Sequence, residues 1–227
     1  MKSVTITRPD GATCNAFYAE PASPAGAPGL VVIQEWWGVN DQIKGVAERY
    51  AAAGFRVLVP DLYRGAQGLN AKEAEHLMTG LNFADAAGQD TRGCVLHLKQ
   101  ASTKVGVTGY CMGGAVSLLA AVFVPEVDAV VSWYGFPPLE YVDATKITAP
   151  IMGHFATDDA FFPIAMVDVL ENKLKEAHVA HVIHRYNATH AFANEAPTDP
   201  SLPIKYDPTA ASTAWDRSIE FLRRNLS

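Results

Sequence analysis

The sequence predicts an α/β fold, in which a mainly parallel central sheet carries helices on both faces. Runs of β-branched and aromatic residues alternate along the chain with segments of helical periodicity, the order typical of such folds. Apolar residues make up 49% of the 227 residues, which is enough to bury a sizeable core. No repeat, low-complexity tract or convincing internal boundary interrupts the alternation, so we expect one domain over residues 1–227.

The first two runs are expected to form an antiparallel hairpin at the edge of the sheet. They are SVTIT (3–7) and TCNAFYAE (13–20), separated by the turn residues RPDGA. The linker PASPAGAP follows. The next run, GLVVIQE (29–35), is almost continuously apolar and suits a central strand, because such strands are buried on both faces.

A helix and a strand are expected next. Asn40 or Asp41 can cap the helix, and Gly54 ends it. The strand FRVLVPD occupies 55–61. Residues 72–100 have helical periodicity but contain several glycines, so we expect two helices with a break between them.

The rest of the chain continues the alternation. We expect strands at 104–110, 128–135, 150–156 and 179–187, and helices over 112–124, from Pro163, and over 209–224. Proline suits the first turn of a helix, because the N–H that it lacks has no partner there. Residues 194–208 contain four prolines and are expected to form a surface loop.

Charge and hydropathy exclude several classes of partner. The net charge is -6, and acidic and basic residues are mixed along the chain, so no basic stripe exists to neutralise nucleic acid or an anionic membrane. The longest apolar stretch, 115–124, contains Ser117 and stops at Pro125. It is far shorter than the ~20 residues of a membrane helix. We expect a small-molecule partner and a monomer or homodimer.

The start of the chain and its cysteines predict a cytoplasmic protein. The segment MKSVTITRPDGATC alternates polar and apolar residues, which indicates a strand rather than a signal peptide. The three cysteines, Cys14, Cys94 and Cys111, are odd in number and widely spaced, as is typical of a reduced compartment.

Cys111 has the most distinctive surroundings of the three. Gly109-Tyr110-Cys111-Met112-Gly113 gives the spacing G-x-C-x-G between a predicted strand and a predicted helix. This is the pattern of the nucleophile elbow of α/β-hydrolases, with cysteine in place of serine. The small neighbours let strand and helix pass closely, and the start of the helix favours a thiolate. A buried cysteine in a tightly packed turn is the alternative.

A thiol nucleophile needs a base, and the base needs an orienting acid. In this fold both follow the nucleophile, each on a loop after a strand. The strand 150–156 leads into Asp158 and Asp159, and the strand 179–187 leads into His190. The local pattern does not distinguish the two aspartates.

The other histidines do not form a metal site in this interpretation. His181 and His184 lie on one predicted strand and point to opposite faces, so they are a poor metal pair. His154 is expected to pack inside a strand or to make a local hydrogen bond. His76, His97 and His178 are expected at the surface. We expect neither a metal nor a cofactor.

Three parts of the sequence together resemble the dienelactone hydrolase family, over nearly the whole chain. They are QEWWGVNDQI with VPDLYRG, then VGVTGYCMGGA, then DDAFFP with THAFAN. The resemblance implies an α/β-hydrolase fold and hydrolysis of a small ester or lactone through an acyl-thioester. A non-catalytic binding module with the same fold is the alternative, and a redox role for Cys111 is a third.

The resemblance also implies roles for single residues. Cys111 would be the nucleophile and His190 the base. Asp159 would be the acid, because the family places it four residues before a proline, here Pro163. Glu35 matches a buried glutamate that is thought to hold the resting cysteine as a neutral thiol and to accept its proton when substrate arrives. The alternative for Glu35 is a surface charge at the end of a strand.

The resemblance places an oxyanion hole at the backbone N–H groups of Met112 and Trp36. The wall of the cleft would include the aromatic residues Trp36, Trp37, Tyr134 and Phe161, which as ordinary core residues would look the same.

The sequence departs from the family where anionic substrates are held. Members that act on anionic dienelactones hold the substrate carboxylate with arginines, one of them four residues after the catalytic histidine. That position is Asn194 here. Residues 65–89 contain Lys72 but no arginine, and Arg64, which precedes them, is the candidate substitute. We therefore expect neutral or less anionic esters.

Overall fold

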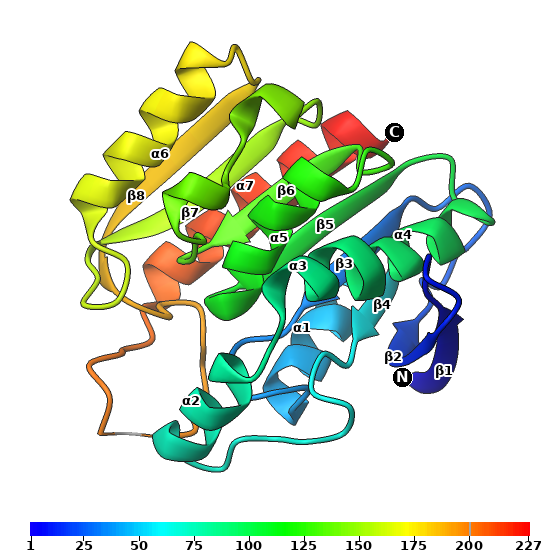
Figure 1. Ribbon diagram of the computed structural model, residues 1–227, viewed down its shortest axis with the longest axis horizontal. Coiled ribbons are helices and arrows are strands. Elements are labelled where there is room, and N and C mark those ends of the chain that lie inside the picture. Colours follow the sequence, from blue (N-terminus) through cyan, green and yellow to red (C-terminus); the bar gives the residue numbers. More distant parts are fainter. Residues whose placement is uncertain (200) are drawn as a thin grey trace.

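The computed structural model describes residues 1–199 and 201–227, and its strands form one eight-stranded sheet in the order β1-β2-β4-β3-β5-β6-β7-β8 (Figure 1). The strands are β1 (Lys2–Thr7), β2 (Thr13–Ala19), β3 (Gly29–Ile33), β4 (Arg56–Pro60), β5 (Val105–Tyr110), β6 (Ala129–Trp133), β7 (Ile151–Asp158) and β8 (His181–Thr189). The expected edge hairpin is confirmed, because β1 pairs antiparallel with β2, which pairs antiparallel with β4. The remaining neighbours pair in parallel.

Helices cover both faces of this sheet, which confirms the predicted fold class. They are α1 (Asp41–Ala52), α2 (Ala71–Thr79), α3 (Phe83–Asp85), α4 (Arg92–Lys99), α5 (Met112–Phe123), α6 (Ile164–Glu176) and α7 (Pro208–Leu226), with the π-helical segment η1 (Ala86–Thr91) and the 3-10 turns η2 (Leu139–Tyr141) and η3 (Ala144–Lys146). Figure 1 shows α3, α4 and α5 in front of the sheet, with α1 and α7 behind it.

Alternating strand residues separate the interior into two cores. On β3, Val31 and Ile33 pack in the core shared with α4, α5 and α6, whereas Leu30 and Val32 pack in the core shared with α1 and α7. Successive side chains of a strand point to opposite faces, so a strand covered on both sides must be apolar at every position. This requirement explains the continuous apolar run of β3.

Two details of the helices go beyond the sequence prediction. Asn40, rather than Asp41, caps α1, since its Oδ1 accepts the N–H of Ile43 at 3.1 Å. The break expected within 72–100 lies at 80–82, but Gly88 and Gly93 do not interrupt the second helical segment, which runs through α3, η1 and α4. A Cβ at Gly93 would lie 3.0 Å from the carbonyl oxygen of Thr7, so this glycine lets α4 pack against β1.

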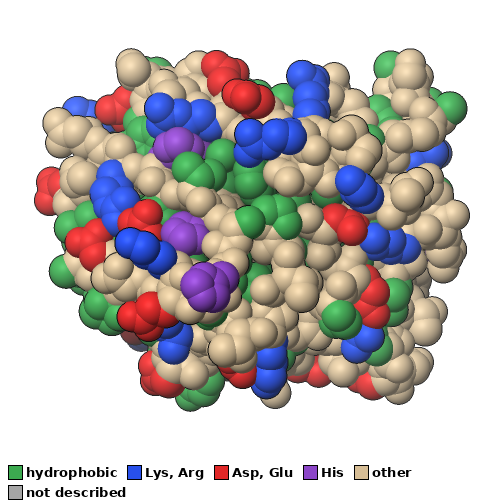
Figure 2. Space-filling view, turned by 90° about the horizontal axis from the view of Figure 1, so that it is seen from above, with side chains coloured by type: hydrophobic (Ala, Val, Ile, Leu, Met, Phe, Trp, Pro, Cys, Tyr) green, Lys and Arg blue, Asp and Glu red, His purple; other side chains and the backbone are tan. Residues whose placement is uncertain are grey.

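The distribution of charge on the surface and the apolar character of the helices can be described directly. On the face seen in Figure 2, basic and acidic side chains are interspersed and do not gather in a stripe of one sign. Within the described ranges 1–199 and 201–227, no helix combines the length and the apolar character needed to cross a bilayer.

A buried polar network crosses from β7 to α7. His154 is fully buried, its Nδ1 lies 2.8 Å from the hydroxyl of Tyr186, and its Nε2 lies 2.8 Å from Ser218 Oγ. Ser218 donates its own proton to the carbonyl of Ala214 at 2.9 Å, so Nε2–H of His154 is the donor to Ser218. Burial, together with the nearby His184 and Arg217, holds the pKa of His154 well below its ordinary value.

We expect acid to destabilise this network. The unfolded chain takes up a proton on His154 near the ordinary histidine pKa of about 6.5, whereas burial lowers the pKa of His154 in the folded protein. The free energy of unfolding therefore falls as the pH drops below about 6.5. His154→Gln should flatten this fall, and it should cost about 1–3 kcal/mol at neutral pH because it disrupts buried hydrogen bonds.

Urea unfolding of the two proteins at neutral and at mildly acidic pH measures this difference. His184→Gln is the matched control, because His184 is less buried and its removal should change the pH dependence less. Parallel pH curves for the unaltered protein and His154→Gln would contradict the expectation.

Candidate active site

Cys111 lies at a strained turn between β5 and α5. Its φ of 55° and ψ of -116° place it in a region that non-glycine residues rarely adopt, at a cost of about 1–3 kcal/mol. A Cβ at Gly109 would lie 2.0 Å from the carbonyl oxygen of Gly113, and a Cβ at Gly113 would lie 2.5 Å from that of Gln34. The two glycines of G-x-C-x-G are therefore needed for strand and helix to approach.

A third glycine, which sequence reasoning missed, completes the turn. A Cβ at Gly135 would lie 1.9 Å from the carbonyl oxygen of Cys111. Gly135 follows β6, whose last residue, Trp133, accepts the N–H of Cys111 at 2.9 Å. The residue between them, Tyr134, also has a left-handed φ of 38°. The signal in the sequence was a glycine two residues after the strand that neighbours the elbow.

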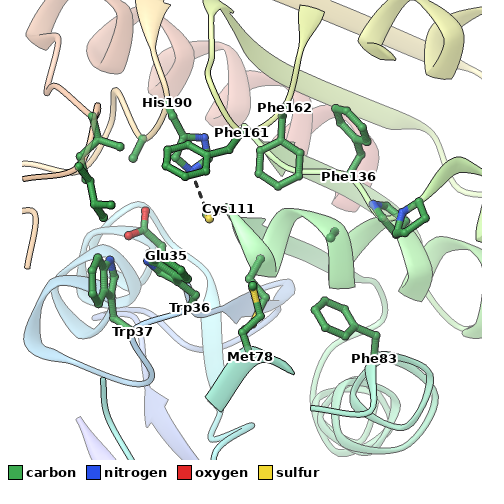
Figure 3. Close-up of a pocket in the computed structure, with 17 residues that line it drawn as sticks. Glu35, Trp36, Trp37, Met78, Phe83, Cys111, Phe136, Phe161, Phe162 and His190 are labelled. Atoms are coloured by element: carbon green, nitrogen blue, oxygen red, sulfur yellow. Dashed lines mark hydrogen bonds between the residues drawn. The ribbon is translucent and has the colours of Figure 1, made fainter. Parts of the chain in front are cut away.

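The carboxyl ends of β5, β7 and β8 bring three side chains into a hydrogen-bonded chain. Cys111 Sγ lies 3.2 Å from Nε2 of His190, the contact drawn as a dashed line in Figure 3. His190 Nδ1 lies 2.8 Å from Oδ2 of Asp159. The other oxygen of Asp159 accepts the backbone N–H groups of Phe161 and Phe162 at 2.8 and 2.9 Å, which orients the carboxylate.

This geometry distinguishes the two aspartates that the local sequence pattern left open. Asp158 is the last residue of β7 and is exposed, whereas Asp159 is buried against His190. Burial by itself would lower the pKa of His190, but Cys111 and Asp159 raise that pKa to about 10. The imidazole therefore holds a proton readily when it faces the sulfur.

Glu35 follows β3 and is buried beside the three hydrogen-bonded side chains. The alternative interpretation of Glu35 as a surface charge at the end of a strand is therefore wrong. Its Oε1 accepts the hydroxyl proton of Tyr134 at 3.2 Å, and its Oε2 accepts Nδ2 of Asn194 at 2.7 Å. Burial raises the pKa of Glu35, while His190 and the two donors act in the opposite direction. The sulfur of Cys111 is hydrogen-bonded to His190 and not to Glu35.

A pocket with a cavity volume of about 300 Å³ opens above Cys111. Its lining is apolar except for Glu35, Cys111 and His190. Figure 3 shows the pocket running between two sets of large side chains, Met78 and Phe83 on one side and Phe136 and Phe162 on the other. The lining also contains Trp36, Trp37 and Phe161 from the sequence analysis, and Leu202 and Ile204 from the loop 194–208.

The structure corrects three expectations about the cleft. Tyr134 and Asn194 are buried and bind Glu35, so they contribute to the site from behind the lining. Both Oδ atoms of Asp90 accept Nη2 of Arg64 at 2.9 Å, and the carbonyl of Asp61 accepts its Nη1 at 3.0 Å. Arg64 therefore neutralises a buried carboxylate and does not substitute for the arginines of the family. Among the described residues, no lysine or arginine lines the pocket.

Most of the pocket lining could not be identified from local sequence. Met78, Phe83, Phe136 and Phe162 come from separate loops and helices, and only the tertiary fold brings them together. The one available signal was the presence of the apolar residues Leu202 and Ile204 in a segment otherwise typical of a surface loop.

The two residues expected to form the oxyanion hole, Trp36 and Met112, both line the pocket with Cys111. Met112 is the first residue of α5, where an N–H has no carbonyl one turn earlier to bind. Trp36 follows β3, the strand that pairs with β5. As for metals, the part of the chain that the structure describes contains no group of three or more His, Cys, Asp or Glu suited to bind one.

Comparison with known proteins places this chain in a family. The family model described as "Dienelactone hydrolase family" matches residues 14–226. "Protein usf" of Aquifex pyrophilus is 34% identical over 213 residues, which cover 89% of this chain and 90% of the relative. A protein of Aquifex aeolicus, provisionally named carboxymethylenebutenolidase, is 32% identical over 217 residues, covering 90% and 92%.

A solved structure shares the fold over almost its full length. The crystal structure of a provisionally named dienelactone hydrolase from Klebsiella pneumoniae matches with a TM-score of 0.86. The match covers 98% of both chains at 23% sequence identity.

We expect Gly135→Ala to damage the turn at Cys111. The added methyl group would lie 1.9 Å from the Cys111 carbonyl oxygen, so the elbow must move. Such overpacking costs about 1–3 kcal/mol. Urea unfolding measures the loss, and the rate at which Cys111 reacts with a soluble disulfide reagent reports the displacement.

Gly45→Ala is the matched control for this substitution. Gly45 lies inside α1 with open space around its Cα, so alanine should stabilise the helix by about 0.5–1 kcal/mol. Equal stability of the two variants would contradict the steric role of Gly135.

Proposed function

The chain belongs to the dienelactone hydrolase family, and we propose that it hydrolyses small, uncharged esters or lactones through a Cys–His–Asp triad. The observation that carries the proposal is the unbroken chain of contacts from Cys111 Sγ through His190 to Asp159, at the base of an apolar pocket. A nucleophile within reach of a base that a third group orients is the arrangement of covalent acyl transfer.

In the first half of the reaction, His190 Nε2 takes the proton of the Cys111 thiol, and Sγ attacks the carbonyl carbon of the ester. Asp159 accepts Nδ1–H and so fixes the ring and stabilises the imidazolium. The N–H groups of Trp36 and Met112 donate to the oxygen that becomes negative. One such donor is typically worth about 100- to 1000-fold in turnover. His190 then protonates the leaving alkoxide, and an acyl-thioester remains on Cys111.

In the second half, water replaces the alcohol. His190 Nε2 takes a proton from water as the oxygen attacks the thioester carbonyl, and the C–S bond breaks. The carboxylic acid leaves, and the proton on His190 is shared again with the sulfur. In the acyl-thioester the sulfur carries no charge, so the contribution of Cys111 to the raised pKa of His190 is absent and the imidazole is free to take the proton of water.

The lining of the pocket supports an uncharged substrate. A carboxylate that entered the pocket would lose its hydration without meeting a lysine or arginine among the described lining residues, which is costly. Asn194, at the position where the family resemblance places an arginine, is buried and already bound to Glu35. The large apolar side chains that flank Cys111 fit alkyl or aryl parts of an ester.

A non-catalytic binding module is the competing function, and it predicts different behaviour of the pocket. It requires a pocket that binds ligand without turnover and does not depend on the thiol. The complete hydrogen-bonded chain and the strained elbow favour the hydrolase, because a binding pocket needs neither.

We expect ester turnover to require all three members of the triad. Cys111→Ala and His190→Gln should each lower kcat/KM on a small neutral aryl ester by at least about 10⁴-fold, and Asp159→Asn should lower it by about 10⁴-fold. Release of the phenol measures the rates. The matched control is Asp158→Asn, whose exposed carboxylate lies outside the contact with His190. Turnover that survives in Cys111→Ala would favour the binding module.

We also expect the protein to prefer neutral esters. For two aryl esters matched in acyl length, one ending in a methyl group and one in a carboxylate, kcat/KM should favour the neutral ester by at least about tenfold, or 1.4 kcal/mol. The physical reason is the missing cation in the pocket. An anionic dienelactone, assayed beside both esters with Cys111→Ala as the blank, completes the comparison. A strong preference for the anionic substrates would rule out this assignment.

A further inference from the structure

We propose that Tyr134 and Asn194 are positioning residues that occupy both carboxylate oxygens of Glu35 and so prevent them from binding the thiol. Cys111 is then paired with His190 before any substrate binds. The inference rests on the proposed function, in which Cys111 is the nucleophile. It differs from the role that the family resemblance implies for Glu35, which is to hold the resting cysteine as a neutral thiol.

Each oxygen of Glu35 has its own donor. The hydroxyl of Tyr134 donates to Oε1 at 3.2 Å and the amide of Asn194 donates to Oε2 at 2.7 Å. Glu35 lines the pocket together with Cys111, and Figure 3 shows its carboxylate beside the sulfur. To bind the thiol proton, one of these oxygens would have to give up its present donor.

The amide of Asn194 can present only its NH₂ group to Glu35. Its Oδ1 accepts the backbone N–H of Ala196 at 3.0 Å. The backbone N–H of Asn194 donates to the carbonyl of Ala191 at 2.8 Å, which fixes the residue in its loop. A flipped amide would place oxygen against the carboxylate and NH₂ against an N–H, and both contacts repel. The side chain is buried, so no water is at hand to relieve them.

The ring of Tyr134 is held just as firmly. It is fully buried, and it makes edge contacts with the rings of His190 at 5.3 Å and Phe192 at 5.3 Å between centroids. Its backbone has a left-handed φ of 38°, and its N–H donates to the carbonyl of His154 at 2.8 Å. The hydroxyl therefore has little freedom to leave Glu35.

Among the titratable groups that surround the sulfur of Cys111, one is hydrogen-bonded to it. The titratable groups around it are His190 after β8, Glu35 after β3, Tyr63 after β4 and Tyr134 after β6, with Asp159 after β7 acting through the imidazole. Tyr63 directs its hydroxyl to the sulfur of Met112 at 3.1 Å. Of the described groups, His190 alone is hydrogen-bonded to Cys111 Sγ.

The proton of the thiol therefore moves directly from Sγ to Nε2, which leaves a thiolate and an imidazolium. Glu35 and Asp159 both face that imidazolium and stabilise it by charge, without exchanging a proton. Because Asn194 is uncharged, its bond to Glu35 does not depend on a substrate carboxylate. Activation of the nucleophile is then independent of substrate charge.

The rate of alkylation by neutral iodoacetamide, measured in the absence of substrate, tests this inference. The unaltered protein should react at Cys111 at about pH 7, and it should show thiolate absorbance in the ultraviolet. Asn194→Ala frees one oxygen of Glu35 to bind the thiol, so alkylation should slow by about tenfold, because the thiolate and not the thiol is the nucleophile. The double variant Asn194→Ala, Glu35→Gln should recover the rate, because its amide no longer favours the neutral thiol.

Tyr134→Phe provides a second test that changes the shape of the core very little. It should slow alkylation in the same direction, and Glu35→Gln should again restore the rate. A purely structural role would give no such recovery. An unchanged rate in both single variants, or loss of the thiolate in Glu35→Gln alone, would overturn the proposal.

Ester turnover separates this inference from the proposed function. Absence of turnover in a protein whose Cys111 still alkylates as a thiolate would refute the hydrolase and leave the role of Tyr134 and Asn194 supported. Cys111→Ala serves as the blank for alkylation, since Cys14 and Cys94 are buried.

Discussion

The strained backbone of Cys111 is the constraint on which the rest of the site depends. A residue at φ 55° between a strand and a helix is stable only where the surroundings hold it, and here they hold it from three directions. Gly109 and Gly113 allow β5, α5 and the end of β3 to meet, and Gly135 brings the end of β6 against the carbonyl of Cys111. The strand ends that press on the turn also carry Glu35 and Tyr134. The same strand ends therefore fix both the position of the sulfur and the positions of Glu35 and Tyr134.

Local sequence was sufficient for the parts of this site that are themselves local. The spacing around Cys111 predicts a strand, a tight turn and a helix because these interactions lie within a few residues. The order of strand, acid, strand and histidine was likewise readable from the chain. Asp158 and Asp159 could not be separated in that way, since their difference is which one turns inward to His190. The family resemblance indicated Asp159, and the contact agrees.

The parts that sequence reasoning missed depend on contacts across the sheet. Gly135 matters because β6 lies next to β5, and Asn194 matters because its loop returns over the end of β3. Tyr134 was expected in the wall of the cleft because it is aromatic and lies near a strand end, yet its hydroxyl turns to a buried carboxylate. Aromatic character alone does not say which way a ring faces.

The ion pair of Arg64 constrains how the specificity of this pocket can change. Asp90 is almost fully buried, and it is neutralised by Arg64 together with Arg8. Recruiting Arg64 to a new ligand would leave Arg8 as the remaining cationic partner of that carboxylate, and a buried charge that loses a partner destabilises the fold. A route toward acidic substrates, whether in evolution or in the laboratory, is therefore less costly through an added positive charge than through the redirection of Arg64. Arg64, the cation that the sequence offered for a substrate carboxylate, already holds two parts of the scaffold together through Asp90.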